Sequence, residues 1–369
     1  MKILVDLTYI HEEYNTGLAN FAFKLLQGFR ENGRADDVAL LVEEGFESGF
    51  RHRIEGFRTI SLKSRYIKSL PMTRGPMMRR ELERIIRAEG FRIMLSTYMY
   101  DRSLITDIIP TVGVIHDTYQ FERQKSLLHL LRFRLGAVHA CNSLSRIVTI
   151  SQCAKKDIAR IKGIKTPADV IYVSVISTAD PSAKQPQEIP YILNVNTIVP
   201  YKNLITLVRA LDILKDRIPH RLLVKGRRSE YWDNTIVPYL QSHSLEDRVQ
   251  LIDRNLSQEE IDSLYVNADL FVTPSTMEGF GATPIEASLA GVPVICNALA
   301  TLVESTREKA TYYSPAEDSQ ALADKILYVL ENRSDIDTES IRAEYLEAYS
   351  TKLQAKQFLD LFDRILSSR

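Results

Sequence analysis

Short apolar runs of strand length recur along this chain and alternate with longer amphipathic stretches. In the first half these runs read MKILVDL, DVALLV, FRIMLST, TVGVIHD and RIVTIS, and they are rich in Val and Ile. A helix-like stretch, 18–29, follows the first of them. Strands that alternate with helices favour parallel sheets covered by helices on both faces. The pattern therefore predicts an α/β fold.

A second series of the same kind follows a polar stretch with three prolines, 177–190 (STADPSAKQPQEIP). Its apolar runs are YILNVN, RLLVKG, VQLID, LFVTP and VPVIC. A chain of 369 residues also exceeds what one hydrophobic core usually supports. We therefore expect two doubly wound domains, 1–178 and 179–352, joined by this linker. The last helix, 353–369, has the first domain as one candidate partner.

Composition excludes several classes of protein. Lys plus Arg and Asp plus Glu number 47 each, so bulk charge does not favour a nucleic-acid partner. No apolar stretch approaches the length that crosses a bilayer, and Asp6 interrupts any signal-peptide core. Cys141, Cys153 and Cys296 are odd in number and form no CxxC pair, which indicates buried thiols in a reducing compartment. We expect a cytoplasmic protein.

One region departs from this balance. Residues 50–92 carry twelve Lys and Arg against four Asp and Glu. Two interpretations are open. The first is a solvated surface with a helix laced by pairs such as Arg79–Glu83 and Glu83–Arg87. The second is a patch that meets anionic lipid headgroups or a phosphorylated acceptor.

The most informative segment is 269–295, DLFVTPSTMEGFGATPIEASLAGVPVI. The strand LFVT should end before the loop STMEGFGAT, at the sheet edge where ligands bind in open α/β folds. Gly279 and Gly281 let the backbone adopt positive φ and approach a ligand closely. Thr283 is expected to cap the following helix and Pro284 to be its first residue.

This loop would point backbone N–H groups and a positive helix end at its ligand, which suits a diphosphate. Glu278 precedes the glycines and Glu286 lies about one turn into the helix, so two carboxylates flank the same concavity. Carboxylates repel phosphate, so we expect them to accept hydrogen bonds from the hydroxyls of a sugar and a ribose. Two glycines alone would fit an ordinary turn; the whole pattern indicates a sugar-nucleotide site.

The two glutamates, in EGFGATPIE followed by ASLAGVPVI, resemble the E-x7-E signature of retaining glycosyltransferases of family 4, the glycosyl transferases group 1. The resemblance implies the GT-B architecture: two Rossmann-like doubly wound domains facing across a cleft. In that family the first Glu and the following amides contact the donor sugar, and the second Glu binds the ribose. Donor binding then falls on Glu278, Gly279, Phe280, Gly281, Ala282, Thr283 and Glu286.

A second segment, YILNVNTIVPYKNLITLVRAL, resembles the first strand and helix of the family's donor domain. By this resemblance Lys202 is the lysine that neutralises the donor diphosphate, and Asn203 follows it as in relatives. Asn196 stands where Gly is usual. Thr197, also assigned to donor binding, stands where many relatives place a second phosphate-binding Arg, and Tyr201 where Arg is common.

These departures leave two alternatives for the phosphate site. Either the protein holds the diphosphate less firmly, or the turn VKGRRS assists through Lys225, Arg227 or Arg228. A basic turn of this kind is usually solvated. We include Lys225 and Arg227 among the expected donor-binding residues.

The N-terminal half contains further matches. TVGVIHDTYQFE resembles the strand and loop that carry the family's HD pair, His116 and Asp117. A lone His is more often structural, but the match favours a cleft position that contacts donor or acceptor. IVTISQCAKKDI resembles the next segment of the family, with Ser151 capping a helix. The turn Asn15–Thr16–Gly17 matches the glycine-containing turn that faces the diphosphate and acceptor in relatives, which assigns Gly17 to donor binding.

The resemblance implies a retaining hexosyltransferase that needs neither metal nor cofactor, with Glu278, His116 and Lys202 as catalytic candidates. No D-x-D motif follows an apolar strand, and no protein nucleophile is expected. The T-I-x-P-x-K-N variant favours GDP-mannose as donor. The basic and apolar stretch 123–140 fits a core helix, but relatives that act on polyprenyl- or lipid-linked glycans place basic apolar helices there. With 50–92, the resemblance therefore implies a glycan or polyprenyl-linked acceptor in surface polysaccharide assembly, at the inner face of the cell membrane.

Other functions compete with this one. A GT-B sugar-nucleotide epimerase would share the architecture, although the donor-loop match argues against it. A non-catalytic sugar-nucleotide-binding partner is an alternative that the departures at Asn196 and Thr197 keep open. A nicotinamide oxidoreductase is disfavoured because no G-x-G-x-x-G follows the first strand.

Overall fold

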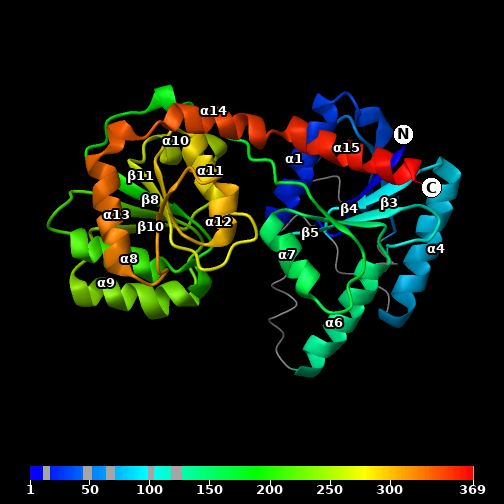
Figure 1. Cartoon of the computed structure of the whole chain (residues 1–369), viewed down its shortest axis with the longest axis horizontal. Coiled ribbons are helices and arrows are strands. Elements are labelled where there is room, and N and C mark those ends of the chain that lie inside the picture. Colours follow the sequence, from blue (N-terminus) through cyan, green and yellow to red (C-terminus); the bar gives the residue numbers. More distant parts are fainter. Residues whose placement is uncertain (11–16, 45–51, 64–70, 99–103, 118–126, 369) are drawn as a thin grey trace. The chain divides into compact units, whose positions relative to one another are not determined.

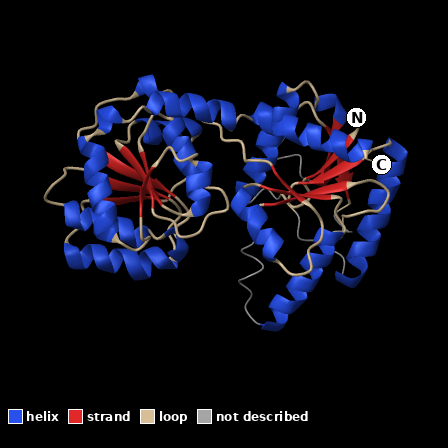
Figure 2. Ribbon diagram, in the orientation of Figure 1, coloured by secondary structure: helices blue, strands red, loops and turns tan. Residues whose placement is uncertain are grey.

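The computed structural model describes residues 1–10, 17–44, 52–63, 71–98, 104–117 and 127–368. The chain forms two compact units: Met1–Ser174 with Tyr349–Arg369, and Val175–Ala348 (Figure 1). In each unit helices cover both faces of a parallel sheet (Figure 2). The predicted α/β fold with two Rossmann-like domains is confirmed. The chain leaves the first unit after Ser174 and returns to it at Tyr349, four residues before each expected boundary.

The sheet of the first unit has the order β3-β2-β1-β4-β5-β6-β7, and every neighbouring pair is parallel. The order reverses between β1 and β4. Strands β2 and β3 lie on one side of β1, and strands β4 to β7 lie on its other side. The strands are β1 (Ile3–Asp6), β2 (Val38–Glu43), β3 (Arg58–Leu62), β4 (Ile93–Ser96), β5 (Thr111–Ile115), β6 (Arg146–Thr149) and β7 (Ala168–Val170).

The described helices of the first unit include one from the far end of the chain. They are α1 (Gly17–Glu31), α4 (Pro71–Glu89), α6 (Leu127–Asn142), α7 (Gln152–Arg160) and α15 (Thr351–Ser367). Ser151 caps α7 as predicted, with its hydroxyl accepting from the amide of Ala154 at 3.0 Å. Helix α15 packs against α1, where the side chain of Asn32 donates to the carbonyl of Lys352 at 2.9 Å (Figure 1).

The sheet of the second unit has the order β10-β9-β8-β11-β12-β13, again parallel throughout. Its strands are β8 (Tyr191–Val195), β9 (Arg221–Lys225), β10 (Val249–Ile252), β11 (Leu270–Thr273), β12 (Val294–Asn297) and β13 (Thr311–Tyr313). This is the strand order of a dinucleotide-binding fold, and it reverses between β8 and β11.

Helices on both faces of this sheet bury two separate cores. Leu270 and Val272 of β11 point to one core, and Phe271 between them points to the other. This alternation is the two-residue period of a strand buried on both sides. The helices are α8 (Leu204–Leu214), α9 (Val237–His243), α10 (Gln258–Val266), α11 (Ala282–Leu289), α12 (Ala300–Ser305), α13 (Ser319–Glu331) and α14 (Thr338–Ala348).

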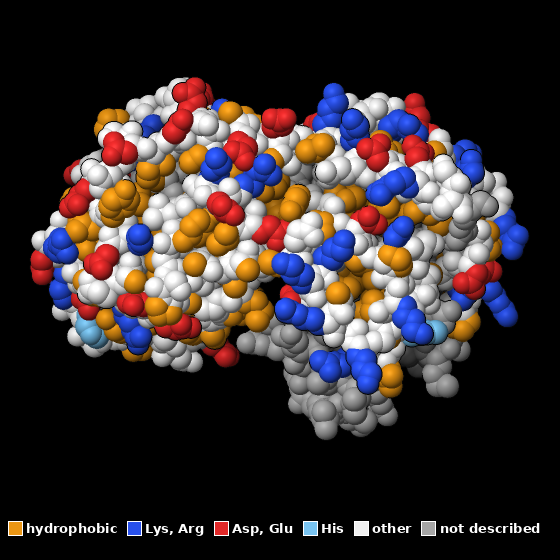
Figure 3. All heavy atoms as spheres, viewed as in Figure 1, with side chains coloured by type: hydrophobic (Ala, Val, Ile, Leu, Met, Phe, Trp, Pro, Cys, Tyr) orange, Lys and Arg blue, Asp and Glu red, His pale blue; other side chains and the backbone are white. Residues whose placement is uncertain are grey.

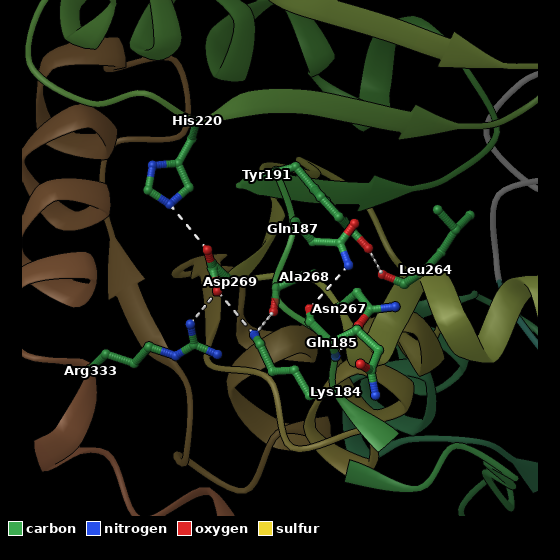
Figure 4. Close-up of polar contacts among 10 residues, drawn as sticks. All are labelled: Lys184, Gln185, Gln187, Tyr191, His220, Leu264, Asn267, Ala268, Asp269 and Arg333. Atoms are coloured by element: carbon green, nitrogen blue, oxygen red, sulfur yellow. Dashed lines mark hydrogen bonds and ion pairs between the residues drawn. The ribbon is translucent and has the colours of Figure 1, made fainter. Parts of the chain in front are cut away.

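The predicted linker, 177–190, packs onto the second unit at the amino-terminal edge of its sheet (Figure 4). Asp269, just before β11, accepts from Lys184 Nζ at 3.0 Å and from the guanidinium of Arg333, and lies 3.4 Å from Nε2 of His220. Although burial opposes the shift, hydrogen bonds from these three partners lower the pKa of Asp269 below its usual range. The stretch is therefore anchored to the domain it leads into.

Cysteines and helix lengths bear on the expectations from composition. Cys141 and Cys296 are buried, Cys153 is half-buried, and each is a free thiol. Within the described part of the chain, no helix is both long enough and apolar enough to cross a membrane.

Candidate functional site

The site residues of the second unit gather where its strand order reverses. Strand β8 leads into the short 3-10 helix Pro200–Lys202, and β11 leads into the glycine-containing loop before α11. Because β8 and β11 are parallel neighbours, both connections leave the same edge of the sheet. Ligands of open α/β sheets bind at this edge, beside the reversal.

An ion pair joins the two connections. Lys202 Nζ lies 2.7 Å from Oε1 of Glu278, and only 15% and 10% of these side chains are exposed. Next to the pair, the amide and hydroxyl of Thr276 both donate to the carbonyl of Tyr201, at 2.9 and 3.0 Å. The lysine and glutamate expected to serve the donor therefore meet at a site whose two loops are already held together.

Asn203 also links the two connections. It adopts the left-handed conformation, with φ of 54°, and is buried. Its side-chain amide donates to the carbonyls of Pro274 and Ala316 at 3.2 and 2.8 Å, and its Oδ1 accepts from Thr206. The side chain of Asn203 is thus engaged by two loop carbonyls and the hydroxyl of Thr206.

Helix α11 begins two residues earlier than predicted. Gly281 is the N-cap, with φ of 84°, and Ala282 is the first helical residue, so the prediction that Thr283 caps the helix is wrong. The reason is steric: a Cβ on Gly281 would lie 2.5 Å from Leu302 Cδ2. Only glycine fits this close approach at positive φ, and Phe280 beside it is buried. Gly279 precedes them in the same loop.

Glu286 lies in the second turn of α11, where its Oε2 accepts a hydrogen bond from the hydroxyl of Tyr265 at 3.0 Å. Tyr265 belongs to α10 and is 3% exposed. The sequence analysis missed this partner. Tyr265 comes 21 residues before Glu286, and no local pattern connects the two.

The loops after β8 and β9 leave the same edge of the sheet, because these strands are parallel neighbours. Lys225 Nζ donates to the carbonyls of Ile252 and Arg254, at 3.4 and 3.0 Å, so its ammonium group supports the loop after β10. Burial lowers the pKa of Lys225. Thr197 and Arg227 are exposed on these loops.

Two further side chains of these loops are Arg228 and Asn196. Arg228 pairs with Asp233 at 2.7 Å. The side-chain Nδ2 of Asn196 is buried and has no hydrogen-bond partner among the described residues, whereas its backbone amide donates to the carbonyl of Lys225 at 3.0 Å. Lys225 thus contacts loop carbonyls and Arg228 contacts an acidic side chain. Arg227 is exposed, and the structure shows neither kind of contact for it.

Two predicted residues, Gly17 and His116, belong to the first unit. Gly17 is the first residue of α1 and is exposed, and its neighbours Asn15 and Thr16 lie outside the described residues. His116 follows β5, with Nε2 2.9 Å from the carbonyl of Thr97. Its described neighbour Asp117 is exposed.

The environment of His116 fixes its protonation state. A carbonyl can only accept, so Nε2 carries the proton and Nδ1 is an acceptor in the neutral ring. The ring of Phe21 meets the imidazole edge-on, with centroids 4.7 Å apart. Burial lowers the pKa of His116 to about 4. At neutral pH His116 is therefore uncharged and suited to accept a hydrogen bond from a hydroxyl.

Among the described residues, no group of three or more His, Cys, Asp or Glu side chains is placed to hold a metal ion. The arrangement in the second unit offers instead one ammonium group, a helix N-terminus and two carboxylates around a single loop. These are the groups that stabilise a diphosphate and accept from hydroxyls.

Two Rossmann-like domains, the second with a strand reversal beside a glycine-containing loop, are typical of the GT-B fold. Residues 176–350 match the model of the family described as glycosyl transferases group 1. The second domain of this chain is thus similar to that family over its whole length. The resemblance drawn from the E-x7-E spacing is confirmed.

Curated relatives are similar at low identity. The O-antigen chain mannosyltransferase RfbU of Salmonella typhimurium is 24% identical over 204 residues, 55% of this chain and 56% of the relative. O-antigen chain mannosyltransferase B of Escherichia coli is 26% identical over 220 residues, with the same shares. The GDP-mannose:cellobiosyl-diphosphopolyprenol alpha-mannosyltransferase of Xanthomonas oryzae pv. oryzae is 28% identical over 163 residues, 43% of each chain. The chain thus spans about half the length of the first two relatives.

Solved structures match over the full length. A glycosyltransferase from Rickettsia africae has a TM-score of 0.77 at 17% identity and covers 100% of this chain and 99% of that one. Anabaena HepE, solved with UDP-glucose, has a TM-score of 0.71 at 16% identity, with 100% of each chain covered. At such identities the likeness concerns the fold alone, and it confirms the GT-B class.

Proposed function

We propose that this protein is a retaining glycosyltransferase that moves a hexose from a nucleotide diphosphate sugar to a glycan, without a metal ion or cofactor. The observation that carries the proposal is the Lys202–Glu278 pair at the strand reversal, beside the N-terminus of α11. The lysine and the helix end provide the positive charge for the diphosphate. The two carboxylates provide acceptors for sugar and ribose hydroxyls.

The chemical demand of the reaction explains this distribution of charge. Breaking the anomeric C–O bond leaves negative charge on the diphosphate and positive character on the sugar. Lys202 and the backbone amides around Gly281 stabilise the negative charge on the diphosphate. Glu278, which lies beside Lys202, accepts hydrogen bonds from hydroxyls of the sugar. We propose a front-face attack in which the departing phosphate takes the acceptor's proton, with no protein nucleophile. Neutral His116 would accept from a hydroxyl of donor or acceptor.

The relatives support a proposal for the substrates. Those aligned above are named mannosyltransferases of O-antigen chains or of a diphosphopolyprenol-linked glycan, and one name specifies GDP-mannose. We propose a GDP-mannose donor, a glycan or polyprenyl-linked acceptor in surface polysaccharide assembly, and a place at the cytoplasmic face of the membrane. The three free thiols suit that reducing compartment.

Surface features of the first unit bear on membrane attachment. Lys and Arg side chains are spread over the face drawn in Figure 3, and Leu135 on α6 is 73% exposed. Within 50–92, however, Arg58, Arg79 and Arg84 are paired with acidic side chains at 2.5–3.1 Å. The expected pair Arg79–Glu83 is among them, so the solvated, ion-paired surface accounts for part of this region. We propose attachment through the remaining basic and apolar side chains.

The experiment is a transfer assay with GDP-, UDP-, dTDP- and ADP-sugars and a lipid-linked glycan acceptor, with and without EDTA. We expect turnover with one donor family, unchanged by EDTA and with the anomeric configuration retained in the product. Lys202→Met should lower kcat on the order of 100-fold, since removal of one transition-state charge partner typically costs that much. Lys215→Met is the matched control, because its ammonium group pairs with Asp212 at 2.9 Å and belongs to none of the loops of the site. Full turnover in Lys202→Met would refute the diphosphate assignment.

A further inference from the structure

The hydroxyl of Tyr265 connects the hydrophobic core of the second unit to the proposed site. Its ring packs among buried residues of the sheet and helices, with its centroid 5.9 Å from that of Phe271. The hydroxyl donates to Glu286 Oε2 at 3.0 Å. Burial, and next the charge of Glu286, raise the pKa of Tyr265 well above its usual value. The phenol therefore stays protonated and remains a donor.

A glutamate side chain has three rotatable bonds, and a ligand that it binds must otherwise order them at a cost in affinity. A donor anchored in the core removes that freedom by fixing one carboxylate oxygen. Oε1 and the remaining lone pair of Oε2 then accept in set directions. Two adjacent hydroxyls are the ligand that matches a carboxylate fixed in this way.

We propose that Tyr265 is a positioning residue for ribose: its hydroxyl orients the Glu286 carboxylate so that it accepts from both the 2′- and 3′-hydroxyls of a nucleoside diphosphate. This inference rests on the proposed function and deepens it. It assigns discrimination between ribonucleotide and deoxyribonucleotide to a pair of helices, α10 and α11, of which only α11 is identifiable from the E-x7-E motif.

The same core contains a matched control. Tyr191, at the start of β8, is 6% exposed, belongs to the same buried cluster, and donates its hydroxyl to the carbonyl of Leu264 at 2.9 Å (Figure 4). Tyr191→Phe removes one buried phenol hydrogen bond, as Tyr265→Phe does, but leaves Glu286 with its partner. A purely structural role would give both variants the same phenotype.

The test uses the full chain and calorimetric Kd values for GDP, 2′-deoxy-GDP and 3′-deoxy-GDP, or for the corresponding diphosphates of another base if that base binds more tightly. We expect the wild type to prefer the ribonucleotide about tenfold or more over each deoxy form, as expected from one charged hydrogen bond. Tyr265→Phe should reduce this preference about fivefold, and Tyr191→Phe should keep it. Glu286→Gln should reduce it at least as much as Tyr265→Phe does.

Each other outcome has a definite meaning. If Tyr265→Phe keeps the wild-type preference while Glu286→Gln loses it, the proposed site stands and the positioning role is overturned. Equal losses in Tyr265→Phe and Tyr191→Phe would also overturn it, because the effect would then be general to the core. If the wild type binds no nucleoside diphosphate, the proposed function itself fails, which is a different result from either of these.

Discussion

At the scale of single residues, the Lys202–Glu278 pair explains how a carboxylate lies beside a phosphate site. Without a ligand the two side chains compensate each other's charge across 2.7 Å in a mostly buried position. A bound diphosphate would attract the lysine and leave Glu278 able to accept from sugar hydroxyls. The ammonium group and the carboxylate are therefore stabilised by each other, and neither is an unpaired buried charge.

His116 gives a prediction about pH. Its pKa is about 4 in the folded protein, against an ordinary value of about 6.5 in the unfolded chain. Between these values the unfolded chain binds the extra proton, so acidification from pH 6.5 to 4 destabilises the fold, by up to about 3 kcal/mol. We expect the unfolding free energy of His116→Gln, from urea titration followed by circular dichroism, to lose less than the wild type over this range.

Carboxylates that titrate in the same pH range are present in both wild type and His116→Gln. The difference between their two stability curves therefore reports on His116 alone. The same imidazole should contribute no step to the activity profile between pH 6 and 8, since it stays neutral throughout. Parallel stability curves for wild type and His116→Gln would show that the folded protein does not hold the ring neutral.

At the scale of elements, the start of α11 depends on Gly281. Gly281→Ala would place a Cβ 2.5 Å from Leu302 Cδ2 at a φ of 84°. We expect a loss of roughly 3 kcal/mol in unfolding free energy, from backbone strain plus overpacking, together with weaker nucleotide binding. Gly33→Ala, at a φ of 66° with no atom within 4 Å, is the control and should cost only about 1 kcal/mol. Equal costs would show that the contact with α12 is unimportant.

The strands and helices that carry the site were predictable because their residues have strong local signals. The apolar runs YILNVN and LFVTP predicted β8 and β11. Ser257 begins α10 with an equally local signal, a capping box with Glu260. The N-cap of α11 was placed two residues late, because the contact that requires glycine at Gly281 comes from Leu302, far along the chain. Tyr265 was missed for the same reason.

The stretch 177–190 shows a limit of composition as evidence. Polar residues and prolines are typical of a linker, but one of them, Lys184, reaches Asp269 at the start of β11. Ion pairs between segments 85 residues apart leave no trace in local composition.

At the scale of the whole molecule, the last helix completes the first unit. Helix α15 buries Phe358, Leu361 and Phe362, and the close approach of α1 depends on Gly28, where a Cβ would lie 2.1 Å from the carbonyl oxygen of Thr351. The sequence predicted this last helix over 353–369, with the first domain only as one candidate partner, because no local pattern identifies the surface that an amphipathic face will cover.

This contact yields a stability prediction for the first unit. Gly28→Ala should lower its unfolding free energy by about 1–3 kcal/mol, because backbone has to move to admit the methyl group. Gly136→Ala, in α6 with no atom within 4 Å, should instead be neutral or stabilising by about 0.5–1 kcal/mol. Thermal unfolding of the two variants decides the matter, and a neutral Gly28→Ala would contradict the packing of α15 on α1.

We propose that the second domain binds a nucleoside diphosphate through Lys202 at its strand reversal. The direct measurement is isothermal titration of GDP, UDP, dTDP and ADP into the wild type and Lys202→Met, with EDTA present. We predict selective binding of one diphosphate by the wild type and binding at least tenfold weaker in Lys202→Met, in keeping with one lost charged hydrogen bond. Equal affinity in both proteins would show that Lys202 does not bind the diphosphate. No binding of any diphosphate by the wild type would show that the second domain is not a nucleotide site.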